Sequence, residues 1–184
     1  MDIQPADREQ DFALIDQFLK GDEKAFTQLF EKYKKKIFYL IYRFVGNATE
    51  AEDLLQDVFI RVYEKMHKFN KTSAFYTWLY RLTINICLNH TGRGYKKKET
   101  LYEDDFVIDQ AKHSQIESSS IDIDLKDALK TLPEKQRTTF ILKVYDDLKF
   151  VDVAKVMGCT VGGAKANYFH AVRKLQEKLG AYRE

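Results

Sequence analysis

The 184-residue sequence has little of what breaks helices or crosslinks small domains. It contains only two prolines and eight glycines, which favours a helical protein. Cys87 and Cys159 lie far apart with no second cysteine near either, which argues against a disulfide framework and for reduced thiols. No apolar run approaches membrane-spanning length, and the first residues, MDIQPADREQD, lack a basic-then-apolar signal pattern. We therefore expect a soluble, cytoplasmic protein without direct membrane insertion.

Residues that would mark an enzyme are also scarce. Cys87 and His90 have a C-x-x-H spacing, but the sequence offers no recognisable frame of further metal ligands. It contains no glycine-rich phosphate loop. We expect no catalysis, no metal and no cofactor. The formal net charge is only +2, so the distribution of charge, rather than its total, must indicate the partners.

The most regular pattern spans residues 50–90, which read as two amphipathic helices joined by the polar connection HKFNKTS. In the first helix, apolar side chains recur at the three/four spacing of one face, and Thr49 with Glu52 forms a capping box that would start it. The opposite face is mainly acidic and carries Asp53, Gln56, Asp57, Arg61 and Glu64. Such a face suits a basic protein partner, and the plain alternative is a solvated face near a helix N-terminus.

The second of these helices has a different surface. Phe75, Leu79, Leu82 and Ile86 form its expected buried line. The rest of its circumference offers aromatic rings, amides and positive charge: Tyr76, Tyr80, Arg81, Asn85, Asn89 and His90. Rings and cations together suit unpaired nucleic acid, because bases stack on rings and phosphates meet cations.

Two further helices precede this stretch and complete an all-helical domain over residues 1–91. A short one ends near Gly21, and a long amphipathic one starts after Asp22 as N-cap and ends at Gly46 and Asn47. Residues 92–121 lose the periodicity and carry a run of acids, which indicates a flexible, solvated linker.

Residues 122–184 return to a helical pattern and form a second expected domain. Thr131 and Glu134 make a capping box around Pro133, a short helix covers residues 150–157, and a turn at residues 158–159 leads to a helix capped by Thr160. This order indicates a helix-turn-helix, whose second helix enters the major groove of DNA. On that helix, six side chains are available to DNA: Lys165, Asn167, Phe169, His170, Arg173 and Lys174.

Two segments resemble a known family. AEDLLQDVFIRVYEKM resembles the polymerase-binding helix of bacterial sigma factors, and KTSAFYTWLYR closely resembles the promoter-melting segment of the extracytoplasmic-function (ECF) branch. The resemblance implies an all-α fold of two helical domains, a partner in core RNA polymerase, and promoter DNA bound as duplex at the −35 element and melted at the −10 element. An anti-sigma factor commonly holds members of this branch inactive, and in the family the linker threads the polymerase's nucleic-acid channel.

The resemblance also assigns roles to residues. Asp53, Gln56, Asp57 and Arg61 would grip the polymerase. The −10 contacts would come from Phe69, Lys71, Ser73, Tyr76, Arg81 and Asn85, with Phe69 and Asn85 forming the pocket for a flipped base. Ala166 and Asn167 depart from the serine or threonine and arginine usual in the family, which affects base preference rather than docking.

Two alternatives stay open from the sequence. The chain could be a free-standing helix-turn-helix regulator acting without polymerase, although this leaves the acidic face at Asp53 and the Phe69 region without a role. Phe69 is expected to be an exposed ring, because its polar connection needs no phenylalanine for packing. The alternative is that its ring folds back onto the helical core.

Overall fold

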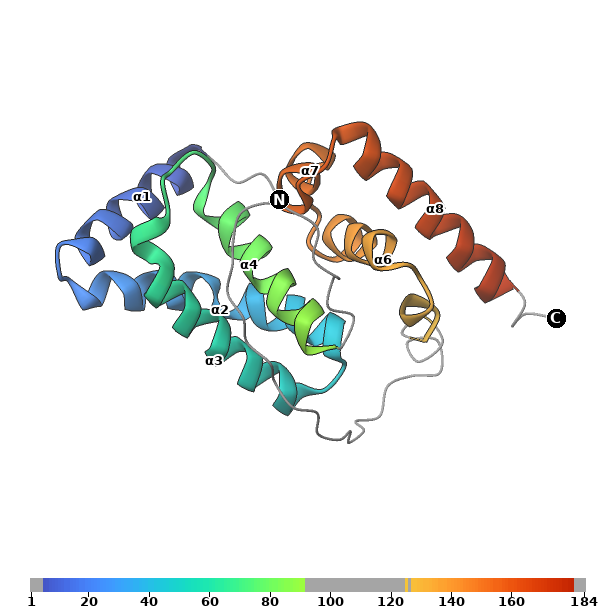
Figure 1. The fold of residues 1–184 in the computed structure, drawn as a ribbon, viewed down its shortest axis with the longest axis horizontal. Helices are drawn as coiled ribbons and strands as arrows, with labels where there is room; N and C mark the ends of the chain where they lie inside the picture. Colours follow the sequence, from blue (N-terminus) through green and yellow to red (C-terminus); the bar gives the residue numbers. More distant parts are fainter. Residues whose placement is uncertain (1–4, 92–124, 126, 181–184) are drawn as a thin grey trace. The chain divides into compact units, whose positions relative to one another are not determined.

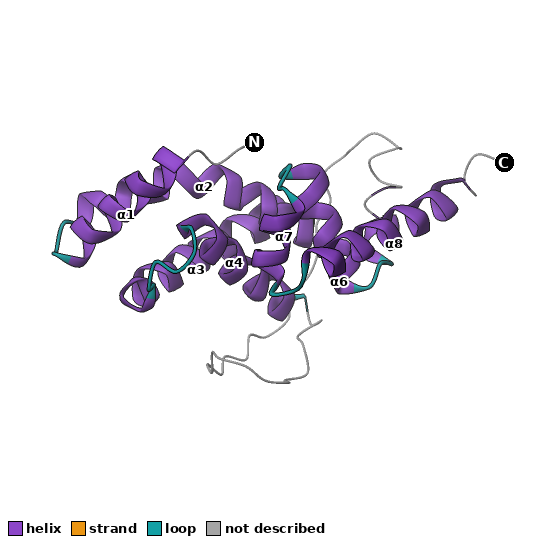
Figure 2. Ribbon diagram, turned by 90° about the horizontal axis from the view of Figure 1, so that it is seen from above, coloured by secondary structure: helices purple, strands orange, loops and turns teal. Residues whose placement is uncertain are grey.

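The computed structural model describes residues 5–91, 125 and 127–180, and these residues form helices joined by turns and bends (Figure 1). The expected all-α fold is confirmed. The N-terminal helices are α1 (Pro5–Leu19), α2 (Glu23–Val45), α3 (Ala48–Lys65), the short 3₁₀ turn η1 (Met66–Lys68) and α4 (Phe75–His90). The C-terminal ones are α6 (Glu134–Phe140), the π-helical turn η2 (Ile141–Tyr145), α7 (Phe150–Met157) and α8 (Val161–Gly180) (Figure 2). No helix of these described residues is long and apolar enough to cross a membrane.

By its internal contacts the chain divides into two compact units. Among the described residues, one contains Asp11–Thr72 and residues 79–91. The other contains the C-terminal helices, with which residues 5–10 and Ser73–Trp78 are grouped. The linker expected at residues 92–121 lies outside the described residues. The domain boundaries at residues 91 and 122 stay a prediction.

The core of the N-terminal unit lies where α2 packs against α3. Both helices turn an apolar stripe inward, and its members are at most 3% exposed: Leu29, Ile37, Leu40 and Ile41 from α2, and Leu54, Val58 and Val62 from α3. The three/four spacing of these residues is the reason that each helix has one buried face. Burying a side chain of this size contributes about 1.5–3 kcal/mol, so this seam is a large source of stability for the unit.

The helix ends of the N-terminal unit follow local chemistry, with one correction. As expected, Asp22 caps α2 by accepting a hydrogen bond from the Lys24 amide at 3.0 Å, and Gly46 ends the helix in the left-handed region at φ 81°. The expected capping box at Thr49 is wrong, because α3 already begins at Ala48. Its N-cap is Asn47, whose side chain accepts from the Glu50 amide at 3.0 Å.

A buried carboxylate ties α1 to α2. Asp11 is only 1% exposed. It accepts hydrogen bonds from Lys32 Nζ at 2.6 Å and from the Tyr33 hydroxyl at 2.5 Å. A charge removed from water is tolerated only when it is paired and hydrogen-bonded, so these two contacts fix where α1 lies on α2.

The buried surface of α4 is wider than its sequence indicates. Phe75 and Leu79 are buried as expected, but Tyr76 and Tyr80 are buried as well, and Leu82 is only half-buried. The expectation that the two tyrosines lie outside the core is therefore wrong. Thr83, fully buried, shows why polarity misleads here: its hydroxyl donates to the Leu79 carbonyl at 2.9 Å, so the helix itself satisfies the polar group.

The C-terminal unit is organised around α8. Its apolar cluster contains Ala128, Leu129, Leu132, Ala171 and Leu175. The expected capping box at Thr131 is wrong, because the Thr131 hydroxyl instead donates to the Ala128 carbonyl at 2.7 Å and closes the preceding turn. Pro133 stands at the N-cap of α6 without a side-chain cap.

The helix-turn-helix forms as expected from α7, a turn and α8. Gly158 adopts φ 62°, in the left-handed region that favours glycine, and reverses the chain after α7. Thr160 Oγ1 then accepts from the Gly163 amide at 3.0 Å and caps α8. A Cβ on Gly163 would lie 3.2 Å from that same hydroxyl, so glycine at this position permits the close cap.

We expect Tyr33→Phe to lower the free energy of unfolding by about 1.5–3 kcal/mol, because it removes a hydrogen bond to the buried Asp11 carboxylate. Tyr39→Phe on the same helix is the matched control, since Tyr39 is 46% exposed and its loss should stay within about 0.5 kcal/mol. Urea titration of both variants measures the difference. Equal losses in the two would show that the Asp11 contacts do not hold α1.

Candidate DNA and protein interfaces

The outer face of α3 is a continuous polar stripe. Asp53, Gln56 and Asp57 are exposed at three/four spacing, on the side opposite the buried seam. The stripe continues one turn further into Ile60, whose side chain is 56% exposed. Arg61 is half-buried beside it. Ile60 was not predicted from the sequence as part of this face, although its position three residues after Asp57 places it there.

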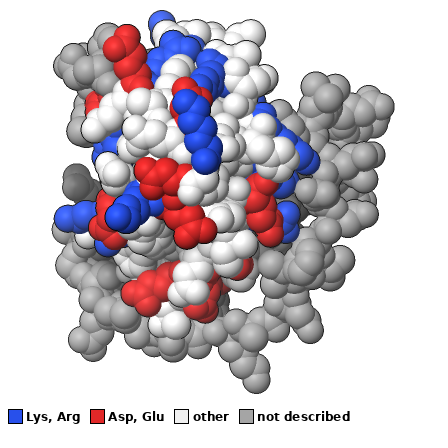
Figure 3. Space-filling model, turned by 90° about the vertical axis from the view of Figure 1, so that its left-hand side faces the viewer, with Lys and Arg blue, Asp and Glu red and all other residues white. Residues whose placement is uncertain are grey.

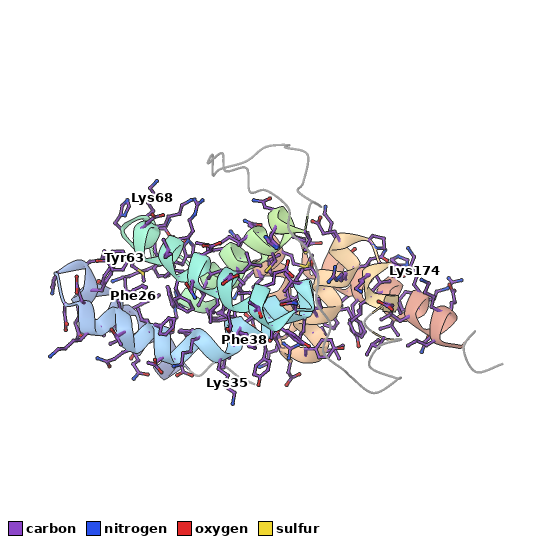
Figure 4. All side chains as sticks on the ribbon, turned by 90° about the horizontal axis from the view of Figure 1, so that it is seen from below. Phe26, Lys35, Phe38, Tyr63, Lys68 and Lys174 are labelled. Atoms are coloured by element: carbon purple, nitrogen blue, oxygen red, sulfur yellow. The ribbon has the colours of Figure 1, made fainter. Side chains whose placement is uncertain are left out.

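An aromatic cluster of Phe18, Phe26 and Tyr63 holds α3, which carries this stripe, against α1 and α2. Tyr63 of α3 lies edge-on to Phe18 of α1 and to Phe26 of α2, with ring centroids 4.9 Å and 5.1 Å away (Figure 4). Edge-to-face pairs at these distances stabilise beyond the area they bury, by about 0.5–1.5 kcal/mol each. Tyr63 itself is 47% exposed, so the apolar end of the α3 face includes an aromatic edge.

Charges of both signs occur on the surface of α1, α2 and α3. Figure 3 shows acidic and basic side chains interspersed on one such face. On α2, Lys35 and Phe38 project away from the seam (Figure 4). Because the signs are mixed there, the acidic run on α3 is a local feature of one helix face.

The loop between η1 and α4 holds three of the expected −10 residues, Phe69, Lys71 and Ser73, and the position of Phe69 differs from the one expected from the sequence. Phe69 is 7% exposed, with its ring centroid 6.0 Å from that of Phe12 in α1. The expectation of an exposed ring is therefore wrong. The polar connection HKFNKTS contains no apolar partner for the ring, but α1, distant in sequence, supplies one.

Lys71 occupies an unusual position in the same loop. Its φ is 58°, a left-handed conformation that residues with a Cβ seldom adopt. Its ammonium pairs with the Asp16 carboxylate and lies 5.6 Å from the centre of the Phe12 ring. Beside it, Asn70 Oδ1 accepts from the Thr72 amide at 3.2 Å and from the Thr72 hydroxyl at 2.7 Å. The loop therefore has a defined conformation.

The expected −10 residues on α4 and just before it fall into an exposed group and a group that is buried or half-buried. Arg81 and Asn85 are exposed and lie one turn apart on one face of the helix. Ser73 is half-buried before the helix, and its hydroxyl donates to the Ala74 carbonyl at 3.4 Å. Tyr76 is buried, and this burial raises the pKa of its hydroxyl to about 12.

The outer face of α8 presents the expected −35 residues in one stripe. Lys165, Phe169, His170, Arg173 and Lys174 are exposed, with Phe169 reaching 64%, while Asn167 is half-buried. Arg173 Nε donates to Glu177 Oε1 at 3.0 Å along the same helix. Because Ala164, Ala171 and Leu175 pack in the core, the exposed side chains of this stripe are not required for packing and can enter a groove.

Both residues of the C-x-x-H pair, Cys87 and His90, lie in the described part of the chain, and each is engaged within the fold. Cys87 is buried, and His90 Nε2 lies 2.5 Å from Glu50 Oε1 across the α3–α4 contact. Among these described residues, no group of three His, Cys, Asp or Glu side chains could hold a metal ion.

Comparison with protein families identifies the class. The family model of Sigma-70 region 2 matches residues 29–95, which include α3, the loop and α4. The model of Sigma-70 region 4 matches residues 122–175, which include the helix-turn-helix. These two regions define a sigma factor of the sigma-70 class.

Relatives that match most of the chain identify the branch of this class. The chain is 36% identical to the RNA polymerase sigma-H factor of Pseudomonas aeruginosa over 183 residues, covering 94% of this chain and 95% of the relative. It is 33% identical to the ECF RNA polymerase sigma factor SigW of Bacillus subtilis over 179 residues, covering 90% and 94%. The chain belongs to the ECF family of RNA polymerase sigma factors, which direct polymerase to promoters and are not enzymes.

Solved structures agree on the fold. The structure of CnrH in complex with the cytosolic domain of CnrY superposes with a TM-score of 0.70 at 20% identity, covering 94% of this chain and 98% of that one. The sigma factor RpoE of Bartonella quintana, in complex with the anti-sigma factor NepR, gives a TM-score of 0.61 at 24% identity, covering 85% and 98%.

We expect Phe69→Ala to lower the free energy of unfolding by about 3 kcal/mol or more, because it leaves a cavity against Phe12. Phe169→Ala is the matched control, since its ring is largely exposed and its loss should stay within about 0.5 kcal/mol. Thermal melting of the two variants measures this. If Phe69→Ala is destabilised but its folded molecules bind single-stranded −10 DNA as the wild type does, Phe69 is not part of a base pocket.

Proposed function

We propose that this sigma factor contacts core RNA polymerase through the exposed α3 face formed by Asp53, Gln56, Asp57 and Ile60. The observation that carries the proposal is the exposed acidic run in the segment that matches region 2. Carboxylates at the rim attract a basic partner, and Ile60 with the half-exposed Tyr63 edge supplies apolar area that such a contact buries. Arg61 borders this surface.

For the −10 element, we assign contacts to the loop and to the exposed face of α4. Arg81 and Asn85 offer a cation and an amide one turn apart, which suits a phosphate and the hydrogen-bonding edge of an unpaired base. Lys71 and Ser73 belong to the same proposed contact. The buried positions of Phe69 and Tyr76 support a role in shaping the loop and helix more than one in direct stacking.

For the −35 element, the stripe on α8 enters the major groove of duplex DNA. Lys165, Arg173 and Lys174 suit phosphates or guanine edges, and Asn167 suits adenine. Phe169 and His170 complete the stripe. The proposed domain division places polymerase and −10 contacts in residues 1–91 and the −35 contact in residues 122–184.

The proposal also covers the location and the regulation of the protein. The factor acts in the cytoplasm, and an anti-sigma factor holds it inactive, as the complexes named for its structural relatives suggest. A free-standing helix-turn-helix regulator is the less supported function, because it would leave the α3 face without a partner.

Reversing the α3 charges tests the polymerase contact. We expect Asp53→Lys with Asp57→Lys to abolish assembly with core RNA polymerase, since like charges would face a basic partner. Stability should change little, because both positions are exposed. Glu9→Lys with Glu23→Lys reverses two other exposed carboxylates as the control. Normal assembly of the α3 double variant in a pull-down would show that this contact is wrongly assigned.

The α8 stripe is tested with Lys165→Ala, against Lys178→Ala in the last turn of the same helix as the control. We expect weaker binding of a duplex selected by the holoenzyme from a random pool, and a log–log salt slope reduced by about 0.9 if one phosphate contact is lost. An unchanged slope with altered base preference would make Lys165 a base reader. No effect on either measurement would remove it from the interface.

A further inference from the structure

Two residues one turn apart on α1 contact two residues two apart in the loop of residues 69–73. Phe12 packs against Phe69 with ring centroids 6.0 Å apart, and Asp16 pairs with Lys71. The Phe12 ring also lies under the Lys71 ammonium, 5.6 Å from its centre. Figure 1 shows the loop running beside α1. These contacts bring together parts of the chain more than fifty residues apart.

The loop needs such support. Lys71 adopts φ 58° although it is neither glycine nor asparagine, and a conformation of this kind persists only when its surroundings hold it. Asn70 and Thr72 provide one restraint through their two hydrogen bonds. Those bonds are local and exposed, so they cannot by themselves fix the loop against the body of the protein. The contacts from α1 do so.

We propose that Asp16, with Phe12, is a positioning residue for melted promoter DNA. It holds the loop of residues 69–73 in its bound form before DNA arrives, so that binding does not have to order it. Asp16 acts through Lys71 and does not touch DNA itself. The proposal rests on the proposed role of this loop at the −10 element, and it assigns α1, which lies outside the matched region 2, to promoter opening.

A competing role for Asp16 would change DNA binding in the opposite direction, so an experiment distinguishes the two roles. If Asp16 only competed with a DNA phosphate for Lys71, its removal would free the ammonium and strengthen binding. Positioning predicts weaker binding. The sign of the change therefore decides between the two roles.

The test uses the full chain assembled with core RNA polymerase and a single-stranded DNA selected from a randomised pool by the wild-type holoenzyme. We expect Asp16→Asn to weaken binding of this strand about 3- to 10-fold, the cost of ordering about one further loop residue. Asp16→Glu, which keeps the carboxylate, should bind within about 2-fold of the wild type. Glu9→Gln removes an exposed α1 carboxylate outside the loop contact and should leave the affinity unchanged.

Two readouts distinguish positioning from a general structural role. Asp16→Asn should slow promoter opening while leaving duplex −35 binding and the melting temperature close to wild type, because a half-exposed ion pair adds little stability. Hydrogen exchange at the amides of residues 70–73 should rise locally. Phe12→Leu, which keeps apolar bulk but loses the ring under Lys71, should change opening in the same direction.

Affinity of Asp16→Asn equal to or above wild type would overturn the proposal, as would exchange unchanged in the loop. If Asn85→Ala and Arg81→Ala also leave binding of the single strand intact, the loop and α4 do not receive melted DNA and the proposed −10 contact fails as well. If only the Asp16 variants bind normally, the −10 contact stands and the positioning role fails.

Discussion

The packing of α2 against α3 is the constraint on which the N-terminal unit depends. Each helix buries one stripe, and the periodicity that places Leu54, Val58 and Val62 inside also places Asp53 and Asp57 outside. The display of the exposed α3 stripe, which we propose to contact polymerase, is therefore a geometric consequence of core packing. A rotation of α3 that exposed the stripe differently would pull buried side chains out of the seam. Such a rotation is costly, because a close-packed interior tolerates little rearrangement.

Features decided by neighbours in sequence were predictable, and those decided by distant partners were not. Asp22 and Thr160 were identified as caps because a cap needs only its own side chain and an amide two or three residues later. Phe69 was misjudged because its partner, Phe12, is supplied by another helix. Thr49 is an exception among the local features, because Asn47, also a good cap and following the left-handed Gly46, had already started the helix.

The site shows the same division. The exposed stripes on α3 and α8 follow from periodicity alone, so their residues could be assigned to a face from the sequence. Ile60 was not predicted to lie on the exposed face of α3, because that face was identified from its polar residues and Ile60 is apolar. The sequence net charge of +2 also hides the pattern, since acids on α3 and cations on α8 cancel in the total. Local charge, and not its sum, sets which partner each surface attracts.

Two carboxylates five residues apart on α1 connect the core to the loop. Asp11 is buried and bonded to Lys32 and Tyr33, so it fixes α1 on α2. Asp16 is half-exposed and pairs with Lys71, so it fixes the loop on α1. The loop's position is thus determined by two contacts in series rather than by its own residues. Loosening the buried contact should therefore disturb the loop even though no residue of the loop has changed, whereas loosening Asp16 should leave the packing of α1 intact. This asymmetry follows from burial, since only the inner carboxylate would be left uncompensated without its partners.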